Sequence, residues 1–132
     1  MWKDALTILR RVGGLPLNVL ILGDVTPAQR NEALHEFRAA SGQDAYRLQG
    51  TTPFELPMVP IHHIVIDQVA DLSADDQETL VRWLDLHLDT TILSFANEPL
   101  FSLVTDGACS ERLFYRLNMV TLRVDDDTGD TR

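Results

Sequence analysis

The sequence contains a single lysine, Lys3, and the other ten of its 11 basic residues are arginines. Because no lysine follows Lys3, any chemistry that needs a lysine in the body of the domain is excluded. It also contains a single cysteine, Cys109, so an internal disulfide and a multi-cysteine zinc site are both excluded. With no histidine near it on a plausible face, Cys109 is interpreted as a small unreactive residue.

Positive charge is scarce overall. The chain carries 20 acidic residues against 11 basic ones, for a formal net charge of −9, and no basic cluster is larger than the pair Arg10 and Arg11. Proteins that bind nucleic-acid backbones depend on clustered lysine and arginine, so we expect no direct nucleic-acid binding.

Long apolar runs are missing as well. No stretch approaches the roughly 18 apolar residues of a membrane span, and residues 1–12 lack the apolar segment of a signal peptide. We therefore expect a cytoplasmic protein with no membrane contact. A reducing compartment also suits a lone cysteine.

What is present is an ordinary globular composition, with 45% apolar and 23% charged residues in 132. We predict one domain over residues 1–124, followed by an acidic disordered tail at 125–132.

Apolar periodicity predicts strands that alternate with helices, which is typical of a three-layer α/β domain with a mostly parallel five-stranded sheet. Three prolines between Gly50 and Pro60 indicate a loop. The third predicted helix has an apolar face of Leu80, Val81, Leu84 and Leu88. The predicted strands are 17–22, 46–48, 61–67, 91–96 and 119–124, and the predicted helices are 2–12, 27–40, 74–88, 99–104 and 111–117.

Gly23 ends the first strand at the place where a phosphate-binding loop would begin. Such a loop reads G-x-x-x-x-G-K-[ST], and here the second glycine, the lysine and the hydroxyl fall on Ala28, Gln29 and Arg30. The favoured interpretation is that Gly23 only lets the strand turn toward the helix. Asp24 is the next residue of this turn.

Asp67 ends a second buried strand, where a carboxylate can hold magnesium through water or cap the following turn. The next residue is Gln68, whose amide cannot act as a general base. Asn97 follows a third strand and either orients a phosphate or closes a turn before Pro99, and we favour the turn. The adjacent His62 and His63 are interpreted as packing residues that cannot form one metal site.

Residues 101–124 resemble a segment of the sigma-54 interaction domain of bacterial enhancer-binding transcription activators, which are AAA+ ATPases with the P-loop NTPase fold. The rest of the chain then falls into register, with residues 20–32 at Walker A, 64–68 at Walker B and 94–97 at the sensor position. The matching positions in the distinctive segment are Gly107, Leu113, Tyr115, Arg116, Leu117, Asn118 and Leu122.

Departures from the family pattern imply lost catalysis. The Walker A lysine is missing, and Gln68 replaces the Walker B glutamate. Of the two finger arginines that act on a neighbouring subunit's nucleotide, one falls on Ser110, while Arg116 remains. The sigma-contacting loop expected between residues 50 and 61 is reduced to a proline-rich connection.

The resemblance thus implies a pseudo-ATPase, with a degenerate nucleotide site at Gly23, Asp24, Asp67 and Asn97 and no cofactor or metal. We expect it to act in transcription regulation through a protein partner, either an AAA+ homologue or a second copy, with Arg116 at the interface.

Two alternatives stay open. The first is binding of a nucleotide or another anion without hydrolysis, at the helix start after Gly23 with Arg30 in place of the lysine, although Asp24 and Asp67 would face the same crevice. The second is a receiver-like signalling domain, which the lack of a lysine disfavours.

Overall fold

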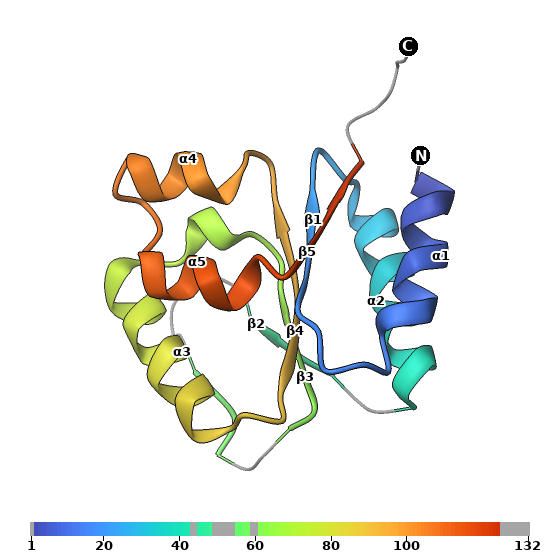
Figure 1. The fold of residues 1–132 in the computed structure, drawn as a ribbon, viewed down its shortest axis with the longest axis horizontal. Helices are drawn as coiled ribbons and strands as arrows, with labels where there is room; N and C mark the ends of the chain where they lie inside the picture. The colour runs from blue at the N-terminus through green and yellow to red at the C-terminus, as the bar shows by residue number, and fades with distance from the viewer. Residues whose placement is uncertain (1, 43–44, 49–54, 59–60, 125–132) are drawn as a thin grey trace.

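The structure is a computed structural model that describes residues 2–42, 45–48, 55–58 and 61–124 (Figure 1). The predicted tail at 125–132 and most of the predicted proline-rich loop lie outside the described residues.

A five-stranded sheet forms the centre of the fold, and all of its neighbouring strands pair in parallel. The strand order is β2-β3-β4-β1-β5. Three of the strands, β1, β3 and β4, are buried along their whole length, which explains their continuous apolar sequences. The strands are β1 (Val19–Leu22), β2 (Ala45–Leu48), β3 (His63–Ile66), β4 (Thr91–Ala96) and β5 (Val120–Arg123).

Helices cover both faces of the sheet, which confirms the predicted three-layer α/β architecture (Figure 1). On one face, α1 (Trp2–Val12) and α2 (Pro27–Ser41) pack around Leu9 and Phe37. The other face is covered by the short 3-10 helix η1 (Val69–Asp71) and by α3 (Ala74–Leu86), α4 (Leu100–Thr105) and α5 (Glu111–Leu117).

The start of α2 follows the sequence signals closely. Thr26 is the N-cap, and its side chain accepts a hydrogen bond from the backbone N–H of Gln29, while the Gln29 side chain accepts one from the Thr26 N–H. Pro27 is the first helical residue. At the other end, Gly42 adopts φ 73°, a conformation that favours glycine and stops the helix there.

The predicted extent of α3 was wrong at its C-terminal end. Ser73 caps the helix as predicted, but the helix ends at Leu86, and the side chain of Leu88 is 77% exposed. The chain turns at His87, because it must enter β4 at Thr91. The ring of His87 stacks on Trp83, with 3.9 Å between the ring centroids. Leu88 therefore lies on a connection beyond the helix and does not reach the core.

A buried glutamine ties α3 to the segment between α4 and α5. Gln77 is 2% exposed, and its amide nitrogen donates to the carbonyls of Leu72 (3.1 Å) and Ala108 (2.7 Å). Its amide oxygen accepts the backbone N–H of Ser110 at 2.7 Å. These three bonds fix the start of α5 against α3.

Within the residues that the structure describes, no helix is both long enough and apolar enough to cross a membrane.

Candidate functional site at the carboxyl edge of the sheet

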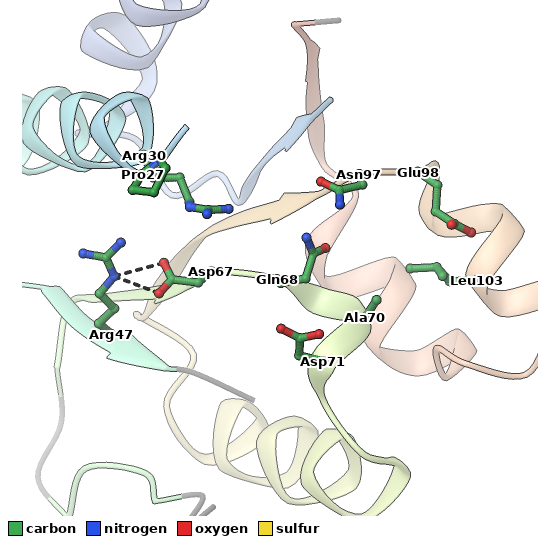
Figure 2. Close-up of a pocket in the computed structure, with 10 residues that line it drawn as sticks. All are labelled: Pro27, Arg30, Arg47, Asp67, Gln68, Ala70, Asp71, Asn97, Glu98 and Leu103. Carbon is green, nitrogen blue, oxygen red and sulfur yellow. Dashed lines mark hydrogen bonds and ion pairs between the residues drawn. The ribbon is translucent and has the colours of Figure 1, made fainter. Parts of the chain in front are cut away.

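A pocket of about 520 Å³ opens where β3 and β4 end, between the start of α2, η1 and α4 (Figure 2). Ligands in open α/β sheets bind at this edge, where strands release the chain into loops. The lining residues are Pro27, Arg30, Arg47, Asp67, Gln68, Ala70, Asp71, Asn97, Glu98 and Leu103.

The carboxylate of Asp67 is held by Arg47. The Nε of Arg47 lies 2.9 and 3.0 Å from the two carboxylate oxygens, and its Nη1 donates to the Asn31 side chain at 3.1 Å. Pairing of β2 with β3 places Arg47 opposite Val65, on the sheet face that Asp67 also shares because side chains alternate along a strand. An arginine thus contacts both oxygens of the carboxylate for which the sequence left open a role in holding magnesium or in capping the following turn.

Two amides lie beside this ion pair. Figure 2 shows the side chains of Gln68 and Asn97 extending toward one another across the pocket. The Oε1 atom of Gln68 is buried and has no hydrogen-bond partner in the described structure. The Asn97 side chain is exposed and makes no hydrogen bond with the described residues, so the predicted side-chain turn before Pro99 is not formed.

The strand-to-helix turn does not have the features of a phosphate cradle. Gly23 has φ 137°, which a residue with a side chain rarely adopts, and its N–H is bonded to the carbonyl of Ala96 at 2.9 Å. At the helix start, Pro27 has no N–H and the N–H of Gln29 is used by the Thr26 cap. Gly23 therefore serves the turn, as the sequence predicts.

The structure brings together only part of the predicted nucleotide site. Asp67 and Asn97 line the pocket, whereas Gly23 is buried in the turn and Asp24 is exposed outside the lining. The expectation that Asp24 and Asp67 face one crevice is therefore wrong for this pocket. Asp67 also does not cap the turn after β3, because its carboxylate turns to Arg47.

Arg116 lies on α5 and is not among the residues that line the pocket. Its guanidinium forms an ion pair with Asp85 of α3, and its side chain is 31% exposed. Arg112 reaches the same carboxylate at 3.1 Å, so two arginines of α5 share one aspartate. The residue predicted as finger-like is engaged within its own chain.

The sequence reasoning missed Arg47, Asp71 and Glu98. Arg47 stands in a four-residue strand, and only the strand order places that strand beside β3. The available signal was an arginine at the end of one strand and an aspartate at the end of another, which becomes informative once the two are neighbours. Asp71 and Glu98 lie in short connections between regular elements. The path of such connections cannot be predicted from apolar periodicity.

The two adjacent histidines differ in environment. His63 is 4% exposed, its ring packs against Phe37, and its Nδ1 lies 2.7 Å from the hydroxyl of Thr91. Burial, with a smaller effect from His62, lowers the pKa of His63 below its usual 6.5. His62 precedes the strand and is exposed, so the packing prediction holds for His63 and is wrong for His62.

Cys109 is 4% exposed, and burial raises the pKa of its thiol. No group of three or more histidine, cysteine or acidic residues in the described part of the chain is placed to hold a metal ion.

No protein-family model matches the sequence, and no curated protein matches it either. Solved structures do match. NtrX from Brucella abortus in complex with ATP superposes with a TM-score of 0.75 at 20% identity, covering 95% of this chain and 37% of NtrX. The P-loop NTPase domain of the sigma-54 transport activator from E. coli gives a TM-score of 0.65 at 12% identity, with 96% of this chain and 95% of that domain covered.

The Holliday junction branch migration motor RuvB from Thermotoga maritima has the same architecture, with a TM-score of 0.64 at 16% identity over 96% of this chain and 45% of RuvB. The chain thus spans between about a third and a half of the NtrX and RuvB structures. These likenesses show that it has the α/β fold of P-loop NTPase domains. At the level of the fold, they confirm the resemblance seen in residues 101–124.

Proposed function

We propose that this chain is a non-catalytic AAA+-like domain that acts in transcription regulation by binding another protein. The observation that carries the proposal is the ion pair between Arg47 and Asp67. A P-loop ATPase uses the carboxylate at the end of this strand to position magnesium. Here both of its oxygens are within hydrogen-bonding distance of the arginine Nε, so a divalent cation would compete with a guanidinium for this carboxylate.

The neighbouring groups support loss of hydrolysis. Gln68 occupies the position of the base that activates water, and an amide does not accept a proton at neutral pH. The only lysine is Lys3, at the start of α1, and it does not line the pocket. The capping box of α2 uses amide hydrogens that a phosphate would need.

Exposed aromatic residues support a protein partner. Phe101 on α4 and Tyr115 on α5 are each 69% exposed, and exposed large apolar side chains are candidates for contact with a protein partner. The two helices contact one another. The partner we propose is an AAA+ homologue or a second copy of the chain, and the regulatory role rests on the similarity to NtrX and to the sigma-54 activator domain.

The test combines an activity assay with a binding assay. We expect no ATP hydrolysis above background with magnesium, and we expect retention of the chain on an immobilised AAA+ domain of a sigma-54 activator, or a dimer by light scattering. The double substitution Phe101→Ser and Tyr115→Ser should weaken that association, while Leu15→Ser, at an exposed leucine outside α4 and α5, should not. Measurable magnesium-dependent hydrolysis, or a strict monomer with no partner, would overturn the proposal.

One alternative function is binding of a nucleotide or another anion at Arg30 without hydrolysis. The side chain of Arg30 lines the pocket, so an anion site without hydrolysis has a cationic group available. Calorimetry with ATP and with ADP, in the presence of magnesium, decides the matter. Dissociation constants weaker than millimolar, corresponding to binding free energies smaller than about 4 kcal/mol, would remove this alternative.

A further inference from the structure

The charges around the pocket are separated by sign. Figure 2 shows Arg30 and Arg47 on the side formed by α2 and β2, and Asp71 and Glu98 on the side formed by η1 and the start of α4. A pocket for a ligand of one charge sign gathers groups of the opposite sign, whereas this one presents both.

Arg47 and Asp67 form an ion pair, so their charges are already compensated within the protein. The groups that remain are the guanidinium of Arg30 and the carboxylates of Asp71 and Glu98. None of these three side chains forms a hydrogen bond or an ion pair with another residue in the described part of the chain. Each is therefore available to a ligand without breaking a protein contact.

Amide groups lie between the two charged sides. The side chains of Gln68 and Asn97 both line the pocket, and a carboxamide can donate and accept hydrogen bonds.

Size and charge together restrict the ligand. The volume of about 520 Å³ is within the range of small-molecule sites. A polyphosphate would bring several negative charges toward Asp67, Asp71 and Glu98, and a simple cation would meet Arg30. A molecule that carries one anionic and one cationic group avoids both conflicts.

We propose that this pocket binds a small zwitterion of the size of a free amino acid or a dipeptide. Its carboxylate pairs with Arg30, its ammonium group faces Asp71 and Glu98, and the amides of Gln68 and Asn97 contact the part between. The site goes beyond the proposed protein-binding role and uses none of the exposed residues on which that role rests.

The experiment uses isothermal titration calorimetry and two-dimensional NMR with named probes: the twenty common amino acids and the dipeptide Gly-Gly, each up to 10 mM. The strongest binder is then compared with its N-acetyl form, which lacks the cation, and with its amide form, which lacks the carboxylate. Each blocked form should bind about tenfold more weakly, because it loses one charge-assisted contact. Inorganic phosphate and ATP serve as anion-only probes and should not compete.

Substitutions assign each charge to its group. Arg30→Gln should weaken binding of the zwitterion about tenfold and leave the affinity for the carboxamide form unchanged. Asp71→Asn should also weaken binding of the zwitterion about tenfold, and it should leave the affinity for the N-acetyl form unchanged. Arg11→Gln and Asp75→Asn, at exposed positions outside the pocket, should leave binding unchanged. Circular dichroism checks that each variant is folded.

Absence of binding by every probe at 10 mM overturns the proposal. Equal affinity for the zwitterion and its blocked forms also overturns it, as does displacement by phosphate or ATP, which would identify an anion site instead. None of these results bears on retention by an AAA+ partner, so failure of this proposal and failure of the proposed function are distinguishable.

Discussion

The Nε of Arg47 lies 2.9 Å and 3.0 Å from the two carboxylate oxygens of Asp67, which joins the end of β2 to the end of β3. The same guanidinium reaches Asn31 on α2. One side chain thus connects two strands and a helix at the edge where the pocket opens.

We expect this pair to make a modest contribution to stability. The side chains are 36% and 21% exposed, and solvent screening limits such pairs to about 0.5–1 kcal/mol. A double-mutant cycle with Arg47→Ala and Asp67→Ala, measured by urea unfolding, should give a coupling energy in that range that shrinks in 1 M salt. The more exposed i,i+4 pair Glu78 and Arg82, 3.5 Å apart, should give a smaller coupling of about 0.3 kcal/mol as the control. Equal coupling in the two pairs would contradict the expectation.

Replacement of Gln77 should be more damaging. Gln77→Leu removes three hydrogen bonds of a buried side chain and leaves the N–H of Ser110 without its part-buried acceptor, at a cost of about 1–3 kcal/mol in the free energy of unfolding. Gln68→Leu is the matched control, since the Oε1 of Gln68 has no partner to lose. Denaturant titration of both variants tests the difference, and a loss for Gln68→Leu as large as that for Gln77→Leu would refute it.

Stability should depend on pH through His63. Its folded-state pKa lies below the ordinary 6.5 because the ring is buried, so the unfolded chain takes up a proton first as the pH falls. The contribution of neutral His63 is fully present above about pH 6.5 and is lost progressively below it. Urea midpoints between pH 8 and pH 5.5 should fall for the wild type and fall less for His63→Asn. The variant His62→Asn, at the exposed neighbour, should keep most of the slope; identical slopes in all three would argue against this assignment.

The thiol of Cys109 should be unreactive in the folded protein. Burial raises its pKa and limits access, and thiolate is the reactive form. We expect a chromogenic disulfide reagent at pH 7.5 to label the native chain far more slowly than the chain in 8 M urea. Similar rates in the two conditions would show that the cysteine is accessible.

Much of the fold could be predicted because its signals are local. The segments 2–12, 91–96 and 111–117 were predicted with the bounds that the structure has. The first is marked by its apolar period and the second by a continuous apolar run. The N-caps Thr26 and Ser73 were also found from side chains that bond within their own first turn. Leu88 shows the limit of this reasoning, because a helical period does not reveal where the next strand forces the chain to turn.

The site was less predictable because it depends on the order of strands. Asp67 and Asn97 could be placed at strand ends from the sequence, but the position of Arg47 beside Asp67 becomes visible only when β2 and β3 are known to be neighbours. Arg116 was singled out by resemblance, and its contact with Asp85 comes from packing of α5 on α3. Long-range side-chain pairing of this kind leaves no periodic trace in a sequence.

The position of β1 has a consequence for the order in which the protein is made. This strand, at residues 19–22, pairs with β4 at 91–96 and with β5 at 120–123, so both of its neighbours are synthesised long after it. Until they emerge, the backbone N–H and C=O groups on both edges of this apolar strand stay unpaired, and contacts so distant in sequence form slowly. A nascent chain that ends before residue 120 would leave one edge of β1 open to other chains, so β5 is the strand that ends this exposure during synthesis.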